Sequence, residues 1–396
     1  MLQLKVEDRL ILSCVKLHPD NQELGQINDL ILQVKDWDYF ISTIIDRGIG
    51  PLMYKKLPHL SNSHIIPDTV RTKLQQSYYL TFSRSTMLYA HFTKAVTALN
   101  ENGIRVIALK GIYLSEYLYI DSGLRQFSDI DLLVNEEDGI KCISILEQIG
   151  YKPSGFKVSE FVKTHTEIIH FPPMISNGVS IEIHTKLHKK SEAYSMNMES
   201  VWKNAIPTTL NGAKVFALDL YNQLIHLCVH LDKHFKGGHV QFTCFNDITN
   251  FLDKYKEIIQ WDELISTCKW YQCENVVFKY LIMVNRYINA TLPANIIERY
   301  SALLSSVDMR LFERYLQGDI LTSAYKMHST NMKQVVGFWA KLKYSFDLLF
   351  PPKAFMVQLY KIRKPWMIVF YYPYRHYIGL KALITYSKEK LSPPLF

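Results

Sequence analysis

Two carboxylates stand two residues apart in the segment Phe127-Ser-Asp-Ile-Asp-Leu-Leu-Val134. The surrounding apolar residues predict a buried strand, and residues two apart on a strand share a face, so Asp129 and Asp131 are expected to point into one cavity. Two such acids without a cation would repel each other, whereas Mg²⁺ binds carboxylate oxygens and reaches nucleotide phosphates with its remaining positions. The spacing therefore favours phosphoryl or nucleotidyl transfer.

The residues upstream of the acids strengthen this interpretation, because an isolated Asp-x-Asp pair more often marks a solvated turn. The segment Arg105-Val-Ile-Ala-Leu-Lys-Gly111 predicts a strand that turns into a helix over Ile112 to Tyr119. A glycine at this turn lets backbone amides approach a phosphate, and the helix N-terminus adds partial positive charge. Lys110 would add a full charge. The structural alternative is a tight turn at Gly111 beside a solvated Lys110.

A hairpin is predicted further along the chain. Asn177-Gly178 is a turn sequence, and the flanking residues predict strands over Thr166–Phe171 and Val179–Thr185. Polar residues alternate on the second strand and therefore share one face: Ser180, Glu182 and His184.

Glu182 is the third acid that two-metal phosphoryl transfer needs beside Asp129 and Asp131. In such a site one metal lowers the pKa of the attacking hydroxyl and the other neutralises the leaving pyrophosphate. His184 would help to orient the acceptor. The alternative for His184 is the polar face of an ordinary antiparallel strand.

Together these residues resemble the nucleotidyltransferase superfamily that includes DNA polymerase beta, whose members carry a glycine turn, an Asp-x-Asp pair and a third acid on a later strand. Within it, the chain is similar to the family labelled uncharacterised nucleotidyltransferase. The motifs that carry this resemblance are Leu109-Lys-Gly111, Gly123-Leu-Arg125, Ser128-Asp-Ile-Asp-Leu-Leu-Val134, Gly150-Tyr151, Glu182-Ile-His184, His226-Leu-Cys-Val-His230, Asn246-Asp-Ile248 and Ile259-Gln-Trp-Asp-Glu-Leu264. The resemblance spans about residues 30 to 300 and implies a bacterial protein associated with polysaccharide biosynthesis.

The phosphate turn departs from the superfamily pattern, which usually has Gly-Ser or Gly-Gly about a dozen residues before the acids. Here Gly111 precedes Asp129 by eighteen positions. The resemblance therefore implies that Lys110, Arg125 and backbone amides contact the nucleotide phosphates. Ser128 resembles the serine of the superfamily's Ser-Asp-x-Asp motif. The alternatives are a local cap for Ser128 and a surface charge for Arg125.

A third group of polar residues lies on a predicted helix over Leu218–Phe235. Its histidines follow at spacings of four and share a face: His226, His230 and His234. Since no glutamate lies between them, a polar face bordering the nucleotide cleft is preferred over a zinc site. His230 and, by the family resemblance, Asp247 are candidate cleft residues.

Length and composition predict a protein with a large core. The chain has 396 residues, of which 48% are hydrophobic and 13% aromatic, which predicts two or three domains. The six cysteines include no Cys-x-x-Cys pair, so reduced thiols are expected. Acids near the first residues and the absence of a run of about eighteen uncharged apolar residues predict a soluble, cytoplasmic protein without a signal peptide.

The positive charge is concentrated at the end of the chain. Residues 331–396 contain eleven Lys or Arg but only two acids, whereas the whole chain has a net charge of +8. The same segment holds many Phe, Trp and Tyr residues. Three interpretations remain open: packing onto the core with snorkelling lysines, association with an anionic membrane surface, and contact with an anionic polymer or nucleic acid.

Hydrophobic periodicity predicts the order of the elements. Apolar residues at intervals of three and four predict helices over Leu30–Asp46, Val70–Leu99 and Asp138–Ile149. We therefore expect an α+β protein with a small mixed-sheet nucleotidyltransferase core between helical segments. The expected segments are a helical N-terminal part at 1–103, the core at 104–205, a helical domain at 206–330 and a basic aromatic tail at 331–396.

The predicted activity is transfer of a nucleoside monophosphate from a nucleoside triphosphate to an unidentified hydroxyl or phosphate acceptor, with release of pyrophosphate. Asp129, Asp131 and Glu182 would bind Mg²⁺ or Mn²⁺. The predicted nucleotide-binding residues are Lys110, Gly111, Arg125 and Ser128. Two alternatives remain: transfer of the γ-phosphate on the same fold, and a nucleotide-binding module that has lost catalysis.

Overall fold

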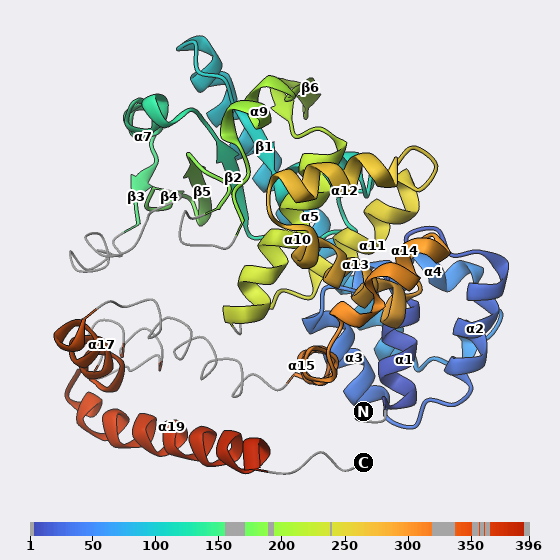
Figure 1. The fold of residues 1–396 in the computed structure, drawn as a ribbon. Coiled ribbons are helices and arrows are strands. Elements are labelled where there is room, and N and C mark those ends of the chain that lie inside the picture. Colours follow the sequence, from blue (N-terminus) through green and yellow to red (C-terminus); the bar gives the residue numbers. More distant parts are fainter. Residues whose placement is uncertain are drawn as a thin grey trace. The chain divides into compact units, whose positions relative to one another are not determined.

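The computed structural model describes residues 4–154, 171–188, 194–237, 240–318, 337–350, 356, 360 and 365–391. These residues belong to two compact units. The first contains Met1–Asp232 and Gln241–Gln317, and the second contains Lys233–Val240 and Gly318–Phe396. Figure 1 follows the elements along the chain.

Helices open the first unit. They are α1 (Val6–Ser13), α2 (Asn21–Ile31), α3 (Trp37–Asp46), α4 (Gly50–Lys56) and the 34-residue α5 (Asp68–Glu101). The helix predicted over Val70–Leu99 lies within α5. The single helix predicted over Leu30–Asp46 is wrong, because α2 ends at Ile31 and Asp36 caps a new helix by accepting a hydrogen bond from the amide of Tyr39 at 2.8 Å.

A seven-stranded mixed sheet forms the centre of the first unit. Its strands are β1 (Ile107–Leu109), β2 (Asp129–Leu133), β3 (Lys152–Pro153), β4 (Met174–Ser176), β5 (Val179–His184), β6 (Ile206–Leu210) and β7 (Ala213–Ala217), in the order β3-β4-β5-β2-β1-β7-β6. The pairs β2·β5 and β1·β7 are parallel, and the other neighbours are antiparallel. Helices and a mixed sheet confirm the predicted α+β class.

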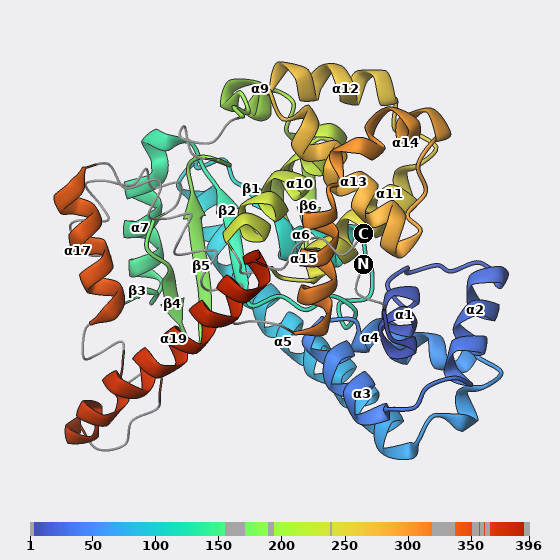
Figure 2. The ribbon, with the colours of Figure 1, turned by 60° about the horizontal axis from the view of Figure 1, so that its bottom comes forward.

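The core packs on one face of this sheet. Ile130 and Leu132 of β2 lie in a buried cluster with Phe92 of α5 and Leu146 of α7 (Gly139–Gln148), the helix predicted over Asp138–Ile149. Because side chains alternate along a strand, Asp129 and Asp131 project from the opposite face. Figure 2 follows α5 from the N-terminal helices to the sheet.

The predicted turn at Asn177-Gly178 is confirmed, whereas its first strand differs from the prediction. Both residues have positive φ, 49° and 75°, as a two-residue type I′ turn requires. This turn pairs Ser176 with Val179, so the partner strand must directly precede it and is β4. Phe171 precedes that strand, and the rest of the predicted strand, residues 166–170, lies outside the described residues.

A second hairpin, which the sequence analysis did not predict, joins the sheet next to β1. It consists of β6 and β7 around Asn211-Gly212, which again have positive φ of 46° and 80°. Ile107 of β1 pairs with Phe216 of β7 in parallel. The sheet therefore extends beyond the core predicted at 104–205.

The remaining described helices of at least six residues complete the two units. They are α6 (Lys110–Tyr117), α9 (Met198–Lys203), α10 (Leu220–Gly237), α11 (Thr243–Tyr255), α12 (Trp261–Trp270), α13 (Glu274–Ile288), α14 (Ala294–Tyr300), α15 (Ser306–Gln317), α17 (Phe338–Leu349) and α19 (Ile368–Leu391). Among the described residues, every helix is too short or too polar to cross a bilayer.

Candidate active site

The predicted phosphate turn lies where β1 passes directly into α6. The helix begins at Lys110, two residues before the predicted start, and Lys110 has a positive φ of 49°. A Cβ atom on Gly111 would lie 2.6 Å from Nη1 of Arg125 and 2.7 Å from Cβ of Phe127. Only glycine therefore fits at this position without displacing those side chains.

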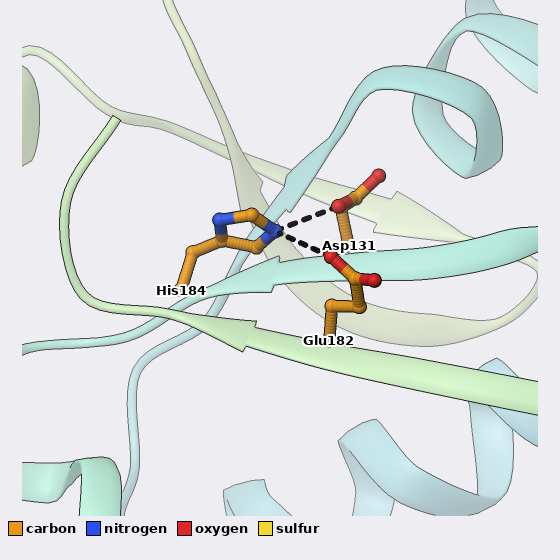
Figure 3. A group of neighbouring side chains, drawn as sticks. All are labelled: Asp131, Glu182 and His184. Atoms are coloured by element: carbon orange, nitrogen blue, oxygen red, sulfur yellow. Dashed lines mark hydrogen bonds and ion pairs between the residues drawn. The ribbon is translucent and has the colours of Figure 1, made fainter. Parts of the chain in front are cut away.

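The acid strand and the third-acid strand are neighbours. Because β2 and β5 pair in parallel, the register sets Asp131 beside Glu182. Nε2 of His184 lies 2.7 Å from Oδ1 of Asp131 and 3.6 Å from Oε2 of Glu182, and the three side chains converge in Figure 3. One ligand atom from each residue lies within 4.8 Å of the others. We call these three residues the acid–histidine group.

Asp129 lies on the same strand face but is not a member of the acid–histidine group. It is partly exposed, pairs in register with Ser180, and accepts a 3.4 Å hydrogen bond from Oγ of Ser128. Two of the three predicted acids, Asp131 and Glu182, therefore meet together with His184. The predicted ligand role of Asp129 stays a prediction.

Lys110 provides the positive charge beside these acids. Its Nζ lies 2.9 Å from Oδ1 of Asp131, and burial is outweighed by Asp131, Asp129 and Glu182, which raise the pKa of Lys110. Burial acts to raise the pKa of Asp131, but Lys110 and His184 hold it well below its usual range. Lys110 is therefore not the solvated side chain of the alternative interpretation.

Asp129 has the opposite electrostatic environment. Burial raises its pKa, and the neighbouring Asp131 carboxylate raises it further, more than Lys110 and Arg125 offset. The ionised form of Asp129 is therefore unfavourable unless further positive charge is placed nearby.

The acid–histidine group fits a divalent cation. It offers two carboxylates and one imidazole on adjacent strands, and carboxylate oxygens are the ligands that Mg²⁺ and Mn²⁺ prefer. The raised pKa of Asp129 marks a place where additional positive charge would stabilise the protein. These donors fit the cation that the sequence predicts.

Arg125 lies in a buried ion pair with Asp247 of α11. Its Nε is 2.9 Å from Oδ1 and its Nη2 is 2.6 Å from Oδ2, which is the two-pronged geometry of a strong pair. Tyr119 donates a third hydrogen bond to Oδ1 of Asp247 at 2.9 Å. The structure thus brings two predicted residues together, although Arg125 pairs with a protein carboxylate and packs next to Gly111.

The other predicted site residues lie around this centre. Ser128 is exposed, and its carbonyl accepts a 2.9 Å hydrogen bond from Nη2 of Arg84, which also reaches the carbonyl of Gly178 at 3.2 Å. His230 on α10 is half-buried; its Nδ1 lies 4.0 Å from Sγ of Cys244 on α11, the helix that carries Asp247.

Sequence reasoning did not single out Tyr119 or Arg84. Tyr119 holds Asp247, and Arg84 ties the acid strand and the hairpin turn to α5. Neither residue belongs to a local motif, and their partners are more than forty positions away in the chain. Only the folded arrangement identifies them.

The comparisons with known proteins agree with this geometry. The profile of the family described as uncharacterised nucleotidyltransferase matches residues 33–289, which include the turn, the acid–histidine group and the Arg125–Asp247 pair. No curated protein and no solved structure matches the chain. Because the match covers more than half of the sequence, the chain belongs to the uncharacterised nucleotidyltransferase family.

Proposed function

We propose that the protein is a metal-dependent nucleotidyltransferase that moves a nucleoside monophosphate from a nucleoside triphosphate to a hydroxyl or phosphate acceptor. One observation carries the proposal: Asp131, Glu182 and His184 converge on neighbouring strands beside Lys110 and the glycine turn. Membership of a nucleotidyltransferase family supports a nucleotide substrate. Pyrophosphate would be the second product.

Asp131 and Glu182, with Asp129 beside them, would hold Mg²⁺ or Mn²⁺. When bound, the cation would lower the pKa of the attacking hydroxyl and neutralise charge on the leaving pyrophosphate. His184 fixes the orientation of Asp131 through its 2.7 Å contact.

Lys110 and the start of α6 would bind the phosphates. The Lys110 ammonium lies at the first residue of the helix, where backbone amides also carry partial positive charge. Gly111 lets Arg125 and Phe127 pack against the start of the helix, and the ion pair with Asp247 keeps Arg125 in this position. Ser128 would add a hydroxyl next to Asp129.

The acceptor would be a molecule of polysaccharide biosynthesis, which is the process that the family resemblance implies. A sugar hydroxyl or a sugar phosphate is a nucleophile that this site could use. A cytoplasmic location would supply the nucleoside triphosphate.

The second unit would bring the enzyme to an anionic membrane surface. Large apolar side chains on α17 recur at helical spacing and are at least 49% exposed: Phe338, Leu342, Phe346 and Leu349. A similar exposed series begins just before α19 and continues along it: Trp366, Phe370, Tyr374 and Tyr377. The basic character of residues 331–396 complements anionic headgroups, and aromatic residues favour the membrane interface.

The position of a transferred radiolabel tests the proposed reaction. The purified protein is incubated with Mg²⁺ or Mn²⁺, a bacterial lysate fraction and each nucleoside triphosphate, labelled either at the α- or at the γ-phosphate. Transfer of the α-label alone supports nucleotidyl transfer. Transfer of the γ-label alone would instead establish phosphotransfer, and nucleotide binding without any transfer would establish a non-catalytic binding module.

A further inference from the structure

A cavity of the first unit lies beside α4. It has a volume of about 450 Å³, within the range of small-molecule sites. Its walls come from the segment after α1, from α2, from α4 and the turn that follows, and from the segment between α6 and β2. The lining residues are Leu17, His18, Pro19, Leu24, Leu52, Lys55, Lys56, His59, Tyr119 and Leu124.

Lys56 is the most unusual residue of this cavity. Its side chain is buried, with 4% relative exposure, and its Nζ donates one long hydrogen bond of 3.4 Å to the carbonyl of Leu52. Burial lowers the pKa of Lys56 to about 8, and distant effects of Cys14 and Glu23 offset this only in part. A buried ammonium without a carboxylate in contact is costly for a folded protein.

The neighbouring Lys55 provides a comparison within the same helix. Lys55 is exposed, and its Nζ lies 2.8 Å from a carboxylate oxygen of Asp121. The charge of Lys55 is therefore balanced within the protein, whereas the described contacts of Lys56 include no acid. The Lys56 ammonium is therefore able to pair with an anion that is bound from solution.

The lining defines the chemistry of that partner. The cavity wall contains two lysines and two histidines but no aspartate or glutamate among its described residues. Most of the remaining wall is formed by leucine, proline and tyrosine side chains. Such a wall matches a ligand with a negatively charged end and an apolar body.

We propose that this cavity binds a small organic anion, a phosphate or carboxylate attached to an apolar group, whose charge pairs with Lys56. The inference does not depend on the reaction proposed above, because it rests on residues outside the acid–histidine group. The bound anion would balance the positive charge of Lys56, and its apolar group would displace water from the leucine-lined wall.

The site is connected to the phosphate turn through Tyr119. This residue lines the cavity and also donates a hydrogen bond to Asp247, which in turn pairs with Arg125 next to Gly111. A ligand in contact with Tyr119 would therefore stabilise the arrangement on which the turn depends. The cavity is a site from which an organic anion could influence nucleotide binding.

Competitive acetylation of the full-length protein tests the proposal without any measurement of activity. Acetic anhydride reacts with neutral amines, so at pH 8 the Lys56 amine should react and mass spectrometry should report its modification. Phenyl phosphate should slow the modification of Lys56 by at least about tenfold at saturation. Phenol, which has the same ring without the charge, should not protect Lys56, and the exposed Lys73 should react equally in all samples.

Parallel titrations with benzoate and inorganic phosphate separate the ligand classes. Protection by benzoate as well as phenyl phosphate identifies a general organic-anion site, and protection by phenyl phosphate alone identifies an organic phosphate site. In calorimetric titrations, Lys56→Met should weaken phenyl phosphate binding by at least about tenfold, with Lys73→Met as the matched control. Protection confined to Lys110, equal labelling of Lys56 with and without all three anions, or no labelling of Lys56 would overturn the proposal.

Discussion

The Nζ atom of Lys110 lies 2.9 Å from Oδ1 of Asp131, and Nε2 of His184 lies 2.7 Å from the same oxygen. Two donors from different elements thus meet one buried carboxylate, which fixes Asp131 between the first residue of α6 and β5. The other acid of the motif, Asp129, has no comparable ion pair among its described contacts and has a raised pKa. The two aspartates of one motif therefore differ in what they contribute to stability.

Asp131→Asn is expected to destabilise the metal-free protein. The substitution removes the carboxylate that the Lys110 ammonium contacts, and loss of one partner of a buried ion pair typically costs about 3–5 kcal/mol in the free energy of unfolding. Urea denaturation in the presence of a chelator measures this loss. Unchanged stability would contradict the importance of the Lys110–Asp131 pair.

Asp129→Asn is expected to have the opposite effect on stability. Because burial and Asp131 raise the pKa of Asp129, its charge is unfavourable at pH 7 in the metal-free fold. Removal of this charge should leave the free energy of unfolding unchanged or higher under the same conditions. Asp129→Asn is therefore the cleaner variant for tests of catalysis, and a large loss of stability would contradict this assignment.

The ion pair between Arg125 and Asp247 should show strong coupling. Asp247→Asn alone leaves a buried guanidinium without its carboxylate and is expected to cost about 3–5 kcal/mol in the free energy of unfolding. The double variant Arg125→Met with Asp247→Leu should be more stable than Asp247→Asn, since no charge remains buried. A double-mutant cycle in urea, made from Arg125→Met, Asp247→Leu and this double variant, would refute the coupling if the effects were additive.

Stability should depend on the titration of Lys56. The folded-state pKa of about 8 lies below the ordinary lysine value of 10.5, so the unfolded chain binds more protons between these two values. The free energy of unfolding should therefore gain from Lys56 as pH rises through this window.

Lys56→Met should remove that contribution to the pH dependence. At pH 7 it should also raise the free energy of unfolding by about 3 kcal/mol, since each pKa unit corresponds to about 1.4 kcal/mol. The difference between wild type and variant, measured by urea denaturation from pH 7 to 9.5, checks both effects. A constant difference across this range would contradict the buried, charged state of Lys56.

The second unit should bind vesicles that contain anionic lipid. Co-sedimentation with phosphatidylglycerol vesicles should exceed that with phosphatidylcholine vesicles and should fall with added salt. The double variant Trp339→Ser and Phe346→Ser should bind less tightly, because it removes two exposed aromatic side chains from α17. Equal binding by wild type and variant would refute the membrane surface, and preference for a nucleic acid over vesicles would favour a polymer.

Local signals in the sequence were sufficient for the elements that carry the acids. Asp129 and Asp131 alternate with Ile130 and Leu132, and this period identified β2 and its polar face. The same reasoning found the turn at Asn177-Gly178. It did not use the equivalent Asn211-Gly212, although this pair marks the hairpin of β6 and β7 just as clearly.

Long-range pairing could not be predicted in the same way. The spacing of Asp129, Asp131 and Glu182 suggested a set of three acids. The register between β2 and β5 sets Glu182 beside Asp131, and the side chain of His184, two residues further along β5, also reaches Asp131. Likewise Arg125 has the charge of a phosphate ligand, and nothing near it in sequence indicates its partner, 122 positions away. Tertiary packing decides both arrangements.

The most direct test of the central claim is pyrophosphate release with transfer of an α-³²P label, compared between wild type, Asp129→Asn and Glu137→Gln. Glu137 is an exposed acid outside the acid–histidine group, so its substitution controls for a general change in charge. We expect metal-dependent label transfer with pyrophosphate release by wild type and Glu137→Gln, and none by Asp129→Asn. Full activity of a folded Asp129→Asn would contradict the central claim.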